Sequence, residues 1–165
     1  MWSIVAAVSY PERVIGWKGR LPWHLPLELR LFRTLTWGGI LVMGRRTWES
    51  LRKPLSGRHI WVLGKHTEPH PAIQVFRTLS ALTEALREAT LPIFFVGGEQ
   101  IFRWALGLPQ VSRLYLTWIY LPVKGDAFFP PFSLAEWNPY RWEVFHDQCV
   151  DFIWVEYHRE DKKEN

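Results

Sequence analysis

The sequence lacks several features that define whole classes of protein. Its single cysteine, Cys149, cannot form an internal disulfide, and no basic segment followed by an apolar core opens the chain. We therefore expect a reducing, cytoplasmic location rather than secretion. The longest uninterrupted apolar run, 91–96, is far shorter than the ~20 residues of a membrane-spanning helix, so membrane insertion is not expected.

Several catalytic signatures are also missing. The chain contains neither GxGxxG nor GxxxxGK[ST], which excludes the usual dinucleotide fingerprint and the P-loop. It has no GxSxG, so a serine hydrolase has no support. The six histidines show no HExxH or paired spacing, and we expect no metal site.

What remains is the composition of one globular domain. The 165 residues are 48% apolar and 22% charged, and we expect a single domain over 1–158 followed by a charged tail over 159–165. Charge is unevenly distributed, because residues 1–65 hold 11 Lys and Arg against three Glu, whereas residues 66–165 are net acidic. The basic N-terminal part predicts an anionic ligand without saying which.

Short apolar runs alternate with helical patterns along the chain, which predicts an α/β layered sheet. Strands are expected at 2–8, 40–43, 60–63, 73–76, 92–96, 113–120 and 152–157. Four helices are expected at 25–35, 45–50, 79–89 and 99–106. Because no helical pattern lies between the last two strands, we expect an antiparallel hairpin to finish the sheet.

Glu28 stands out on the helix that contains Pro26. At about 100° per residue, it falls in the middle of an apolar stripe formed by Leu25, Phe32 and Leu35. No opposite charge lies one turn away on that stripe, so a buried Glu28 would need a partner from outside the helix. Such a carboxylate is a candidate functional group. The alternative is a helix rotated so that Glu28 reaches water.

Two strand-to-helix corners could bind phosphate. In ILVMGRRTWES, the strand ends at Gly44 and the helix begins with two arginines, which would add charge-assisted bonds to the free N–H groups of the helix end. In IFFVGGEQIF, two glycines stand at the corresponding corner and would let a diphosphate approach the backbone. The alternatives are a solvated arginine pair and a simple tight turn.

Taken in order, these segments resemble the dihydrofolate reductase family, of the bacterial chromosomal type. VIGWKGRLPWHLPLELRLFR resembles the mobile active-site loop and acidic helix of that family, and MGRRTWESL its cofactor 2′-phosphate segment. FFVGGEQIF resembles its diphosphate segment, and LYLTWIYLPVKGDAFFP its late strand and loop. The blocks occur in the family's order and cover roughly 2–157, with the KPLSGR turn between the first pair and the second.

The resemblance implies a single α/β domain with a central eight-stranded, mostly parallel sheet, an antiparallel C-terminal strand and four flanking helices. It implies the NADPH-dependent reduction of 7,8-dihydrofolate to 5,6,7,8-tetrahydrofolate, by hydride transfer to pterin C6 and protonation of N5 through water. A monomer is expected. Its expected partners are dihydrofolate, with or without further glutamates, and antifolate inhibitors, but no nucleic acid and no membrane.

Carried over residue by residue, the resemblance assigns catalysis to Glu28, Trp23 and Thr117. Glu28 would accept hydrogen bonds from the 2-amino group and N3 of the pterin. Thr117 would hold the Glu28 carboxylate in position, and Trp23 would hold an ordered water beside it. The apolar slot for the pterin and benzoyl rings would comprise Val5, Leu29, Phe32, Leu51, Leu55 and Val96. Arg58 would pair with the α-carboxylate of the glutamate tail, with Lys53 nearby.

The resemblance also implies a set of residues that bind NADPH. Ala7 and Ile15 would meet the nicotinamide carboxamide. The diphosphate would be wrapped by Gly97, Gly98, Glu99, Gln100 and Ile101, and the 2′-phosphate would be held by Arg45, Arg46, Thr47 and Lys65. The remaining cofactor-binding positions would be Gly16, Lys18, Gly19, Gly44, Leu63, Gly64 and Phe102.

Three departures from the family pattern bear on details. Phe102 stands where many members carry a tyrosine, and Trp17 adds bulk to the mobile loop, which keeps Gly16 and Gly19 as possible pivots. The final hairpin around 147–152 is short compared with that of common bacterial members of the family. We therefore hypothesise a loop that stays closed, latched by Asp126.

Three other functions are considered. A pyrimidine deaminoreductase of riboflavin synthesis shares the sheet and NADPH but should lack the pattern from Trp23 to Phe32. A basic nucleic-acid-binding module would need exposed aromatics, whereas Trp61 and Phe94 fall inside expected strands. A folate-binding relative without turnover would keep the same polar groups, so the sequence does not separate it from an enzyme.

Overall fold

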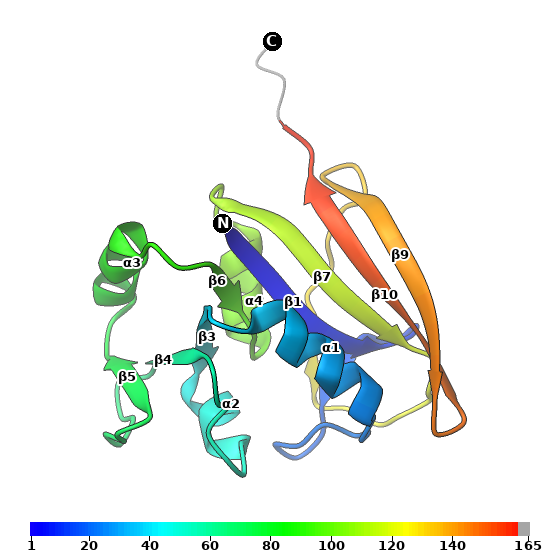
Figure 1. Ribbon diagram of the computed structural model, residues 1–165, viewed down its shortest axis with the longest axis horizontal. Helices are drawn as coiled ribbons and strands as arrows, with labels where there is room; N and C mark the ends of the chain where they lie inside the picture. The colour runs from blue at the N-terminus through cyan, green and yellow to red at the C-terminus, as the bar shows by residue number, and fades with distance from the viewer. Residues whose placement is uncertain (162–165) are drawn as a thin grey trace.

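Strand β1 (Trp2–Ser9) lies inside an eight-stranded sheet, between β6 and β7 (Figure 1). The computed structural model describes residues 1–161. The strand order is β5-β4-β3-β6-β1-β7-β10-β9, and β10 alone runs in the direction opposite to the other seven strands. The other strands of the sheet are β3 (Ile40–Gly44), β4 (His59–Leu63), β5 (Ile73–Phe76), β6 (Ile93–Phe95), β7 (Val111–Ile119), β9 (Trp137–Asp147) and β10 (Val150–Arg159). The expected fold class is therefore confirmed.

The four expected helices are all present, with bounds within one residue of the prediction. They are α1 (Pro26–Thr36), α2 (Arg45–Ser50), α3 (Leu79–Glu88) and α4 (Glu99–Leu106). Local signals explain this agreement. Pro26 suits the first helical position, and the Thr78 hydroxyl accepts a hydrogen bond from the backbone N–H of Ala81 at the start of α3.

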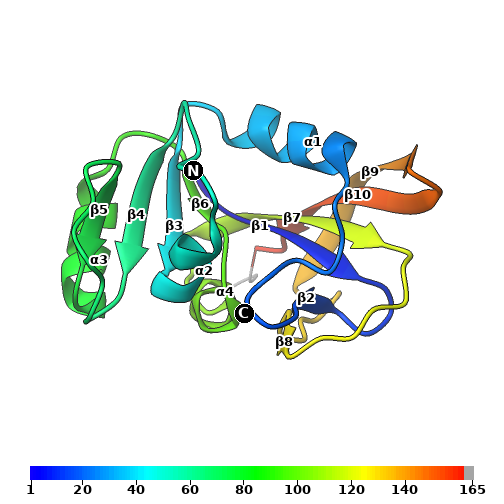
Figure 2. The same ribbon diagram turned by 90° about the horizontal axis from the view of Figure 1, so that it is seen from below.

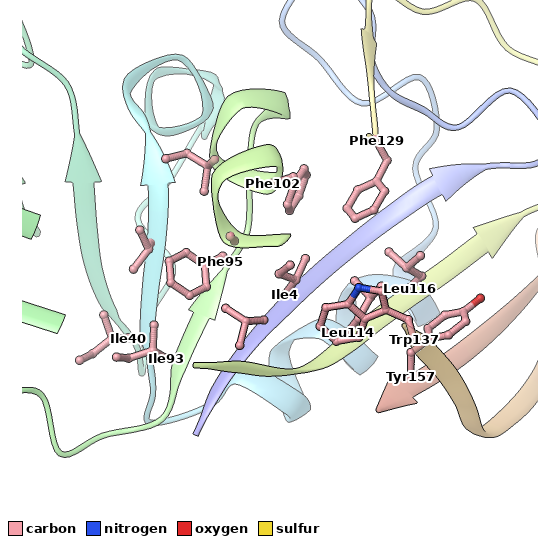
Figure 3. Close-up of a cluster of buried hydrophobic side chains, with 14 of the residues drawn as sticks. Ile4, Ile40, Ile93, Phe95, Phe102, Leu114, Leu116, Phe129, Trp137 and Tyr157 are labelled. Carbon is pink, nitrogen blue, oxygen red and sulfur yellow. The ribbon is translucent and has the colours of Figure 1, made fainter. Parts of the chain in front are cut away.

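Alternate residues of the central strands point to opposite faces of the sheet. Val5 and Tyr115 belong to a buried cluster that includes Phe32 from α1, and we call this side the α1 face. Ile4 and Leu114 belong to the larger cluster on the opposite side, the α4 face, shown in Figure 3. Figure 2 shows α1 and α4 on opposite sides of the sheet. The sheet is therefore buried on both faces over its parallel part, as such sheets require.

The C-terminal part differs from the expectation in one respect. The strands expected at 113–120 and 152–157 do pair antiparallel, as β7 and β10, but the chain between them also forms the long strand β9. Nearly all the residues in the first part of β9 are exposed, so the sequence shows no alternation of buried and exposed positions there. Two further short strands, β2 (Val14–Gly16) and β8 (Ala127–Phe128), form a separate antiparallel pair that was likewise not expected.

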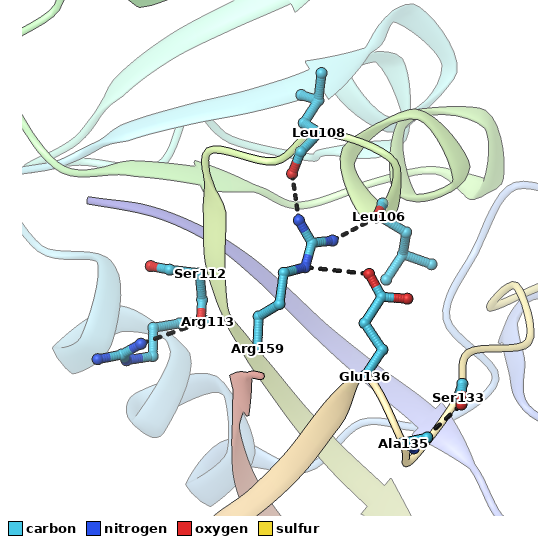
Figure 4. A network of polar contacts seen from close by, with 8 residues as sticks. All are labelled: Leu106, Leu108, Ser112, Arg113, Ser133, Ala135, Glu136 and Arg159. Carbon is cyan, nitrogen blue, oxygen red and sulfur yellow. Dashed lines mark hydrogen bonds and ion pairs between the residues drawn. The ribbon is translucent and has the colours of Figure 1, made fainter. Parts of the chain in front are cut away.

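Arg159, the first residue of the expected charged tail, lies within β10 (Figure 4). Its guanidinium donates hydrogen bonds to the backbone carbonyls of Leu106 and Leu108, at the end of α4, and its Nε lies 3.4 Å from Glu136 Oε1. These contacts satisfy carbonyls that a helix end leaves free, which explains why the strand continues to this residue. Positions 162–165 of the expected tail lie outside the described residues.

Candidate active site

The loops that follow β3, β4 and β6 meet at one edge of the sheet, because these parallel strands all end there. The backbone N–H of Gly44 donates to the carbonyl of Gly97 at 2.9 Å, which joins the first corner to the second. A Cβ at Gly64, in the loop after β4, would lie 2.9 Å from Cβ of Arg45. Binding sites in open α/β sheets occur at this carboxyl edge of the strands.

The first turns of α2 and α4 present free backbone N–H groups at this edge. Their N-cap residues are Gly44 and Gly98, and neither supplies a side-chain cap. Gly97 has a φ of 117°, and a Cβ there would lie 3.2 Å from the ring of Phe102. A side chain therefore does not fit at Gly97, and the backbone stays open to a ligand. Uncapped helix N-termini beside a bare backbone suit a diphosphate.

Basic side chains surround the same corner. Arg46 and Lys65 are exposed, and Arg45 makes only a loose contact of 3.8 Å with Glu49. Two further residues shape the loop after β4 that carries Lys65, and the sequence analysis did not predict either of them. Arg77 donates to the carbonyls of Lys65 and Thr67 at 2.9 and 3.2 Å. The only sequence signal for this role is that Arg77 is a basic residue directly after the expected strand 73–76.

Thr67, the second missed residue, is buried in the loop after β4. Its hydroxyl donates to the carbonyl of Gly64 at 3.1 Å, and its backbone N–H approaches the same oxygen at 3.3 Å. These bonds close a tight turn that carries Lys65. A threonine soon after a Gly-Lys pair is typical of such a turn, but nothing in the sequence indicates that it would be buried.

Glu28 lies on the buried side of α1, with 8% of its surface exposed. The helix is therefore not rotated to bring the carboxylate to water. Burial raises the pKa of Glu28 from 4.5 to about 7, and no neighbouring charge offsets that burial. Within residues 1–161 the carboxylate makes no ion pair. The carboxylate is therefore available to a ligand.

Thr117 and Trp23 lie in the same part of the fold. Thr117 of β7 is buried and pairs with Ala7 of β1, and it shares the α1 face with Tyr115 two positions earlier. Trp23 packs against a cluster that also contains Ala7, and its buried indole Nε1–H has no hydrogen-bond partner. An unsatisfied buried donor in the segment before the helix that carries the buried Glu28 fits an active site that binds a polar ligand.

An apolar cluster on the α1 face brings together most of the expected slot. It contains Val5, Phe32, Leu51, Leu55 and Val96, with Trp48 packed beside them. Leu29 is outside this cluster and is 42% exposed, so its contact with the substrate stays a prediction. The slot is thus formed by β1, α1, the end of β6 and the segment after α2.

Arg58 lies beside this cluster, with its guanidinium 5.9 Å from the centre of the Phe32 ring. It donates to the carbonyl of Ser56 at 3.0 Å and contacts the hydroxyl of Thr36 at 3.4 Å. Burial and the nearby Arg33 lower the pKa of Arg58. Neither arginine forms an ion pair within the described residues, so this pair of cations is available to an anion. Lys53 is exposed.

The loop after β1 closes the other side of the site. Ile15 packs against the α4-face cluster, and Gly16 lies in β2, which pairs with β8. Lys18 and Gly19 are exposed at the turn of the loop. Glu99 at the start of α4 accepts a hydrogen bond at 3.1 Å from the N–H of Phe128 in β8. The loop is therefore tied to the cofactor corner through β8.

The remaining expected cofactor residues lie near the corners or on α4. Ile101 and Phe102 are on the buried side of α4, and Gln100 is exposed. Leu63 ends β4. Within residues 1–161 no cluster of three or more potential metal ligands is present, and no helix of that part is long and apolar enough to cross a membrane.

Known proteins resemble this chain over nearly its whole length. The sequence model of the dihydrofolate reductase family matches residues 1–159. Dihydrofolate reductase type 3 of Salmonella typhimurium is 36% identical over 137 residues, 82% of each chain. Dihydrofolate reductase of Staphylococcus aureus is 35% identical over 128 residues, 77% of each chain. A dihydrofolate reductase from Enterococcus faecalis, solved with NADP(H) and RAB-propyl, superposes with a TM-score of 0.88 at 28% identity, covering 98% of this chain and 97% of that chain.

Proposed function

The chain belongs to the dihydrofolate reductase family, and from that premise we propose a role in the reaction for each residue of the site. The protein is an oxidoreductase that reduces dihydrofolate to tetrahydrofolate with NADPH. The observation that carries the assignment of roles is Glu28, a buried carboxylate on the wall of an apolar slot that makes no ion pair within residues 1–161. A pteridine ring has N–H groups suited to such an acceptor and an apolar face suited to the slot.

Glu28 binds and polarises the substrate. Its carboxylate accepts hydrogen bonds from the 2-amino group and N3 of the pterin, which orients the ring and favours the form that is protonated at N5. The slot excludes water from the carboxylate, so this electrostatic effect is larger than it would be in solvent. None of the other residues assigned to the slot, all of them within residues 1–161, is acidic, so we assign the proton for N5 to water.

Trp23 and Thr117 position the groups around Glu28. The unsatisfied Nε1–H of Trp23 holds the water next to the substrate, and the hydroxyl of Thr117 donates to the carboxylate of Glu28. Both residues act by orienting hydrogen-bond partners rather than by transferring a proton themselves. Their support is their common place on the α1 face, beside Ala7.

The free end of the substrate extends toward Arg58. The guanidinium of Arg58 pairs with the α-carboxylate of the glutamate tail, and the neighbouring Arg33 raises the local potential for further carboxylates, including those of polyglutamylated substrate. Lys53 adds a weaker contact. The aromatic rings of antifolate inhibitors enter the same apolar slot and meet Glu28 at its end.

The fit of the site to NADPH is supported by the corners after β3 and β6. The uncapped first turns of α2 and α4, with the bare backbone at Gly97, hold the diphosphate. Arg45, Arg46 and Lys65 hold the 2′-phosphate. Bound NADPH supplies the hydride that is added to C6 of the pterin. Ala7 and Ile15 orient the ring that carries it, and Phe102 packs behind Gly97 without adding a hydroxyl.

One chain holds every residue assigned above, so a single chain suffices for turnover, as the expected monomer requires. The exposed thiol of Cys149 is compatible with a reducing, cytoplasmic location. A direct assay tests the function. The absorbance of the reduced nicotinamide is followed with NADPH and dihydrofolate, with NADH in place of NADPH, and without folate. Folate-dependent loss that favours NADPH is expected. A folded protein that binds NADPH without folate-dependent loss would overturn the assignment.

A further inference from the structure

The first turn of α1, which carries Glu28, has no side-chain cap of its own. Its N-cap residue, Leu25, has no side-chain oxygen that could accept a hydrogen bond. Pro26 lacks an N–H group, and the N–H of Leu29 donates to the carbonyl of Leu25 at 3.1 Å. The N–H groups of Leu27 and Glu28 are therefore left to partners from outside the helix.

Asp147 supplies one such partner from 120 positions further along the chain. Its Oδ2 atom accepts a hydrogen bond from the N–H of Leu27 at 3.0 Å. Asp147 ends β9 at the turn of the β9–β10 hairpin, which lies near the first turn of α1 in Figure 1. Within residues 1–161 its carboxylate makes no ion pair, so no cation of that part of the chain draws it away from the helix. A carboxylate at this place also interacts favourably with the positive end of the helix dipole.

An apolar cluster holds the same two segments together. Leu27 of α1 packs in it with Phe145 and Val150 of the hairpin, against the fully buried Phe152 of β10. The rings of Phe145 and Phe152 stack, with their centres 5.4 Å apart. Trp23, in the segment before α1, packs against the same cluster. The hairpin therefore contacts the start of α1 through packed side chains as well as through the hydrogen bond to Leu27.

Strand pairing fixes the place of Asp147. The turn of the hairpin consists of Gln148 and Cys149, both with positive φ, and it is flanked by the pair Asp147 and Val150. Two-residue turns of this kind match the twist of the strands that they join. From this pair the register between β9 and β10 continues without a shift as far as Glu156. The carboxylate that reaches α1 is therefore carried by a regular hairpin rather than by a long loop.

We propose that Asp147 is a positioning residue for the reduction of dihydrofolate, because its cap on α1 holds the first turn, and with it Glu28, in the orientation that binds the pterin. This inference rests on the role proposed above for Glu28. Leu27 and Glu28 are adjacent, so fraying of the first turn displaces the buried carboxylate directly. A frayed turn leaves only part of the population competent to bind, and the apparent affinity falls by that fraction.

The later turns of α1 have other attachments. Phe32 and Leu35 pack in the apolar cluster on the α1 face, and the hydroxyl of Thr36 contacts the guanidinium of Arg58 at 3.4 Å. Loss of the cap should therefore loosen the first turn and leave the rest of the helix in place. The effect should fall on the binding of the pterin by Glu28, and not on the binding of NADPH at the corners after β3 and β6.

Amide hydrogen exchange of the ligand-free chain, followed residue by residue by NMR, tests the contact. Asp147→Ala should speed the exchange of the Leu27 amide about 5-fold, because the loss of a helix cap has an effect of that size. Asp147→Asn keeps an acceptor oxygen and should restore slow exchange. Asp151→Ala, at an exposed carboxylate of the same hairpin, should leave the exchange unchanged. Equal exchange of the Leu27 amide in the parent and Asp147→Ala would overturn the proposal.

Equilibrium titrations followed by tryptophan fluorescence test the consequence for binding. Asp147→Ala should raise the Kd for dihydrofolate roughly 5-fold and leave the Kd for NADPH unchanged. Asp147→Asn and Asp151→Ala should bind both ligands as the parent does. An equal loss of affinity for both ligands in Asp147→Ala would indicate a general loosening of the fold and would contradict a positioning role.

A double-mutant cycle separates this inference from the role of Glu28 itself. In a Glu28→Ala background no carboxylate is left to position, so adding Asp147→Ala should change the Kd for dihydrofolate by less than about twofold. Weak binding by Glu28→Ala together with parental binding by Asp147→Ala would overturn the inference alone. Parental binding by Glu28→Ala would overturn the role proposed for Glu28 and, with it, the inference.

Discussion

The backbone N–H of Lys18 donates a hydrogen bond to Oδ2 of Asp126 at 3.0 Å, across 108 positions of sequence. The backbone N–H of Asp126 in turn donates to the carbonyl of Gly16 at 3.0 Å. One aspartate therefore holds the loop after β1 from two sides, beside the β2–β8 pair. These are contacts that a latch at Asp126 would use, and the hypothesis that the loop stays closed during turnover remains a prediction.

Asp126→Ala should loosen this loop. It removes the acceptor for the N–H of Lys18, and the loss of one exposed charge-assisted bond should weaken NADPH binding roughly 5-fold. Fluorescence titration with NADPH measures the change. Asp151→Ala, at an exposed carboxylate on β10 that contacts only His146, is the matched control and should leave binding unchanged. Equal affinities for parent and Asp126→Ala would show that this contact does not hold the loop closed.

Glu28→Gln should keep the fold but slow the reduction of dihydrofolate on the order of 100-fold or more, because it removes the charge that favours the protonated pterin. Steady-state and single-turnover rates measure the effect. Glu84→Gln on the surface of α3 serves as the control for a neutralised glutamate. Turnover at the parental rate in Glu28→Gln would refute the role assigned to this carboxylate.

The buried carboxylate should also make stability depend on pH. Burial raises the pKa of Glu28 to about 7 in the folded chain, whereas an unshifted glutamate titrates near 4.5. Between these values the folded chain keeps a proton that the unfolded chain has lost, so the free energy of unfolding falls as pH rises through this range. Above it, Glu28→Gln should be more stable than the parent by an amount on the order of 3 kcal/mol.

Urea unfolding without ligands, at a series of pH values, measures this difference. The stabilities of parent and Glu28→Gln should converge in their pH dependence below about pH 4.5, where both unfolded and folded carboxyls are protonated. A difference between the two proteins that is independent of pH would mean that Glu28 titrates normally in the folded chain.

Arg46→Ala should weaken NADPH far more than NADH, because only NADPH carries the 2′-phosphate that a guanidinium at this corner would bind. The KM values for the two cofactors measure the selectivity. Arg87→Ala, at a basic position in the last turn of α3, is the control for a lost surface charge. Equal losses for NADPH and NADH would assign the phosphate contact to another residue, with Arg45 and Lys65 as the nearest alternatives.

Local patterns were sufficient for most of the elements. The bounds expected for α2 and α4 agree with the structure because each helix begins directly after a glycine that ends a strand or loop. The burial of Glu28 followed from its place between Leu25 and Phe32 on a helical stripe, which depends only on helix geometry.

Local sequence patterns did not predict elements whose side chains are mostly exposed, nor residues whose burial depends on segments distant in the sequence. Strand β9 was missed because its exposed side chains carry no periodic signal, and its strand conformation depends on pairing with β10. Thr67 bonds to Gly64 within its own turn, but Arg77, which donates to the carbonyl of Thr67, comes from the segment after β5. Leu29 lies beside the apolar stripe of α1 but is left exposed, because nothing in the described chain packs over it.

The sequence by itself determined the α/β class, the four helices and a buried acid, because helical and strand periodicity act between near neighbours. Only the tertiary structure decided which of these elements meet. Gly44 reaches Gly97, and Lys18 reaches Asp126, because the order of strands in the sheet brings the ends of distant segments together. The place of β9 at the margin of the sheet has the same origin, since it depends on which strands pair with one another.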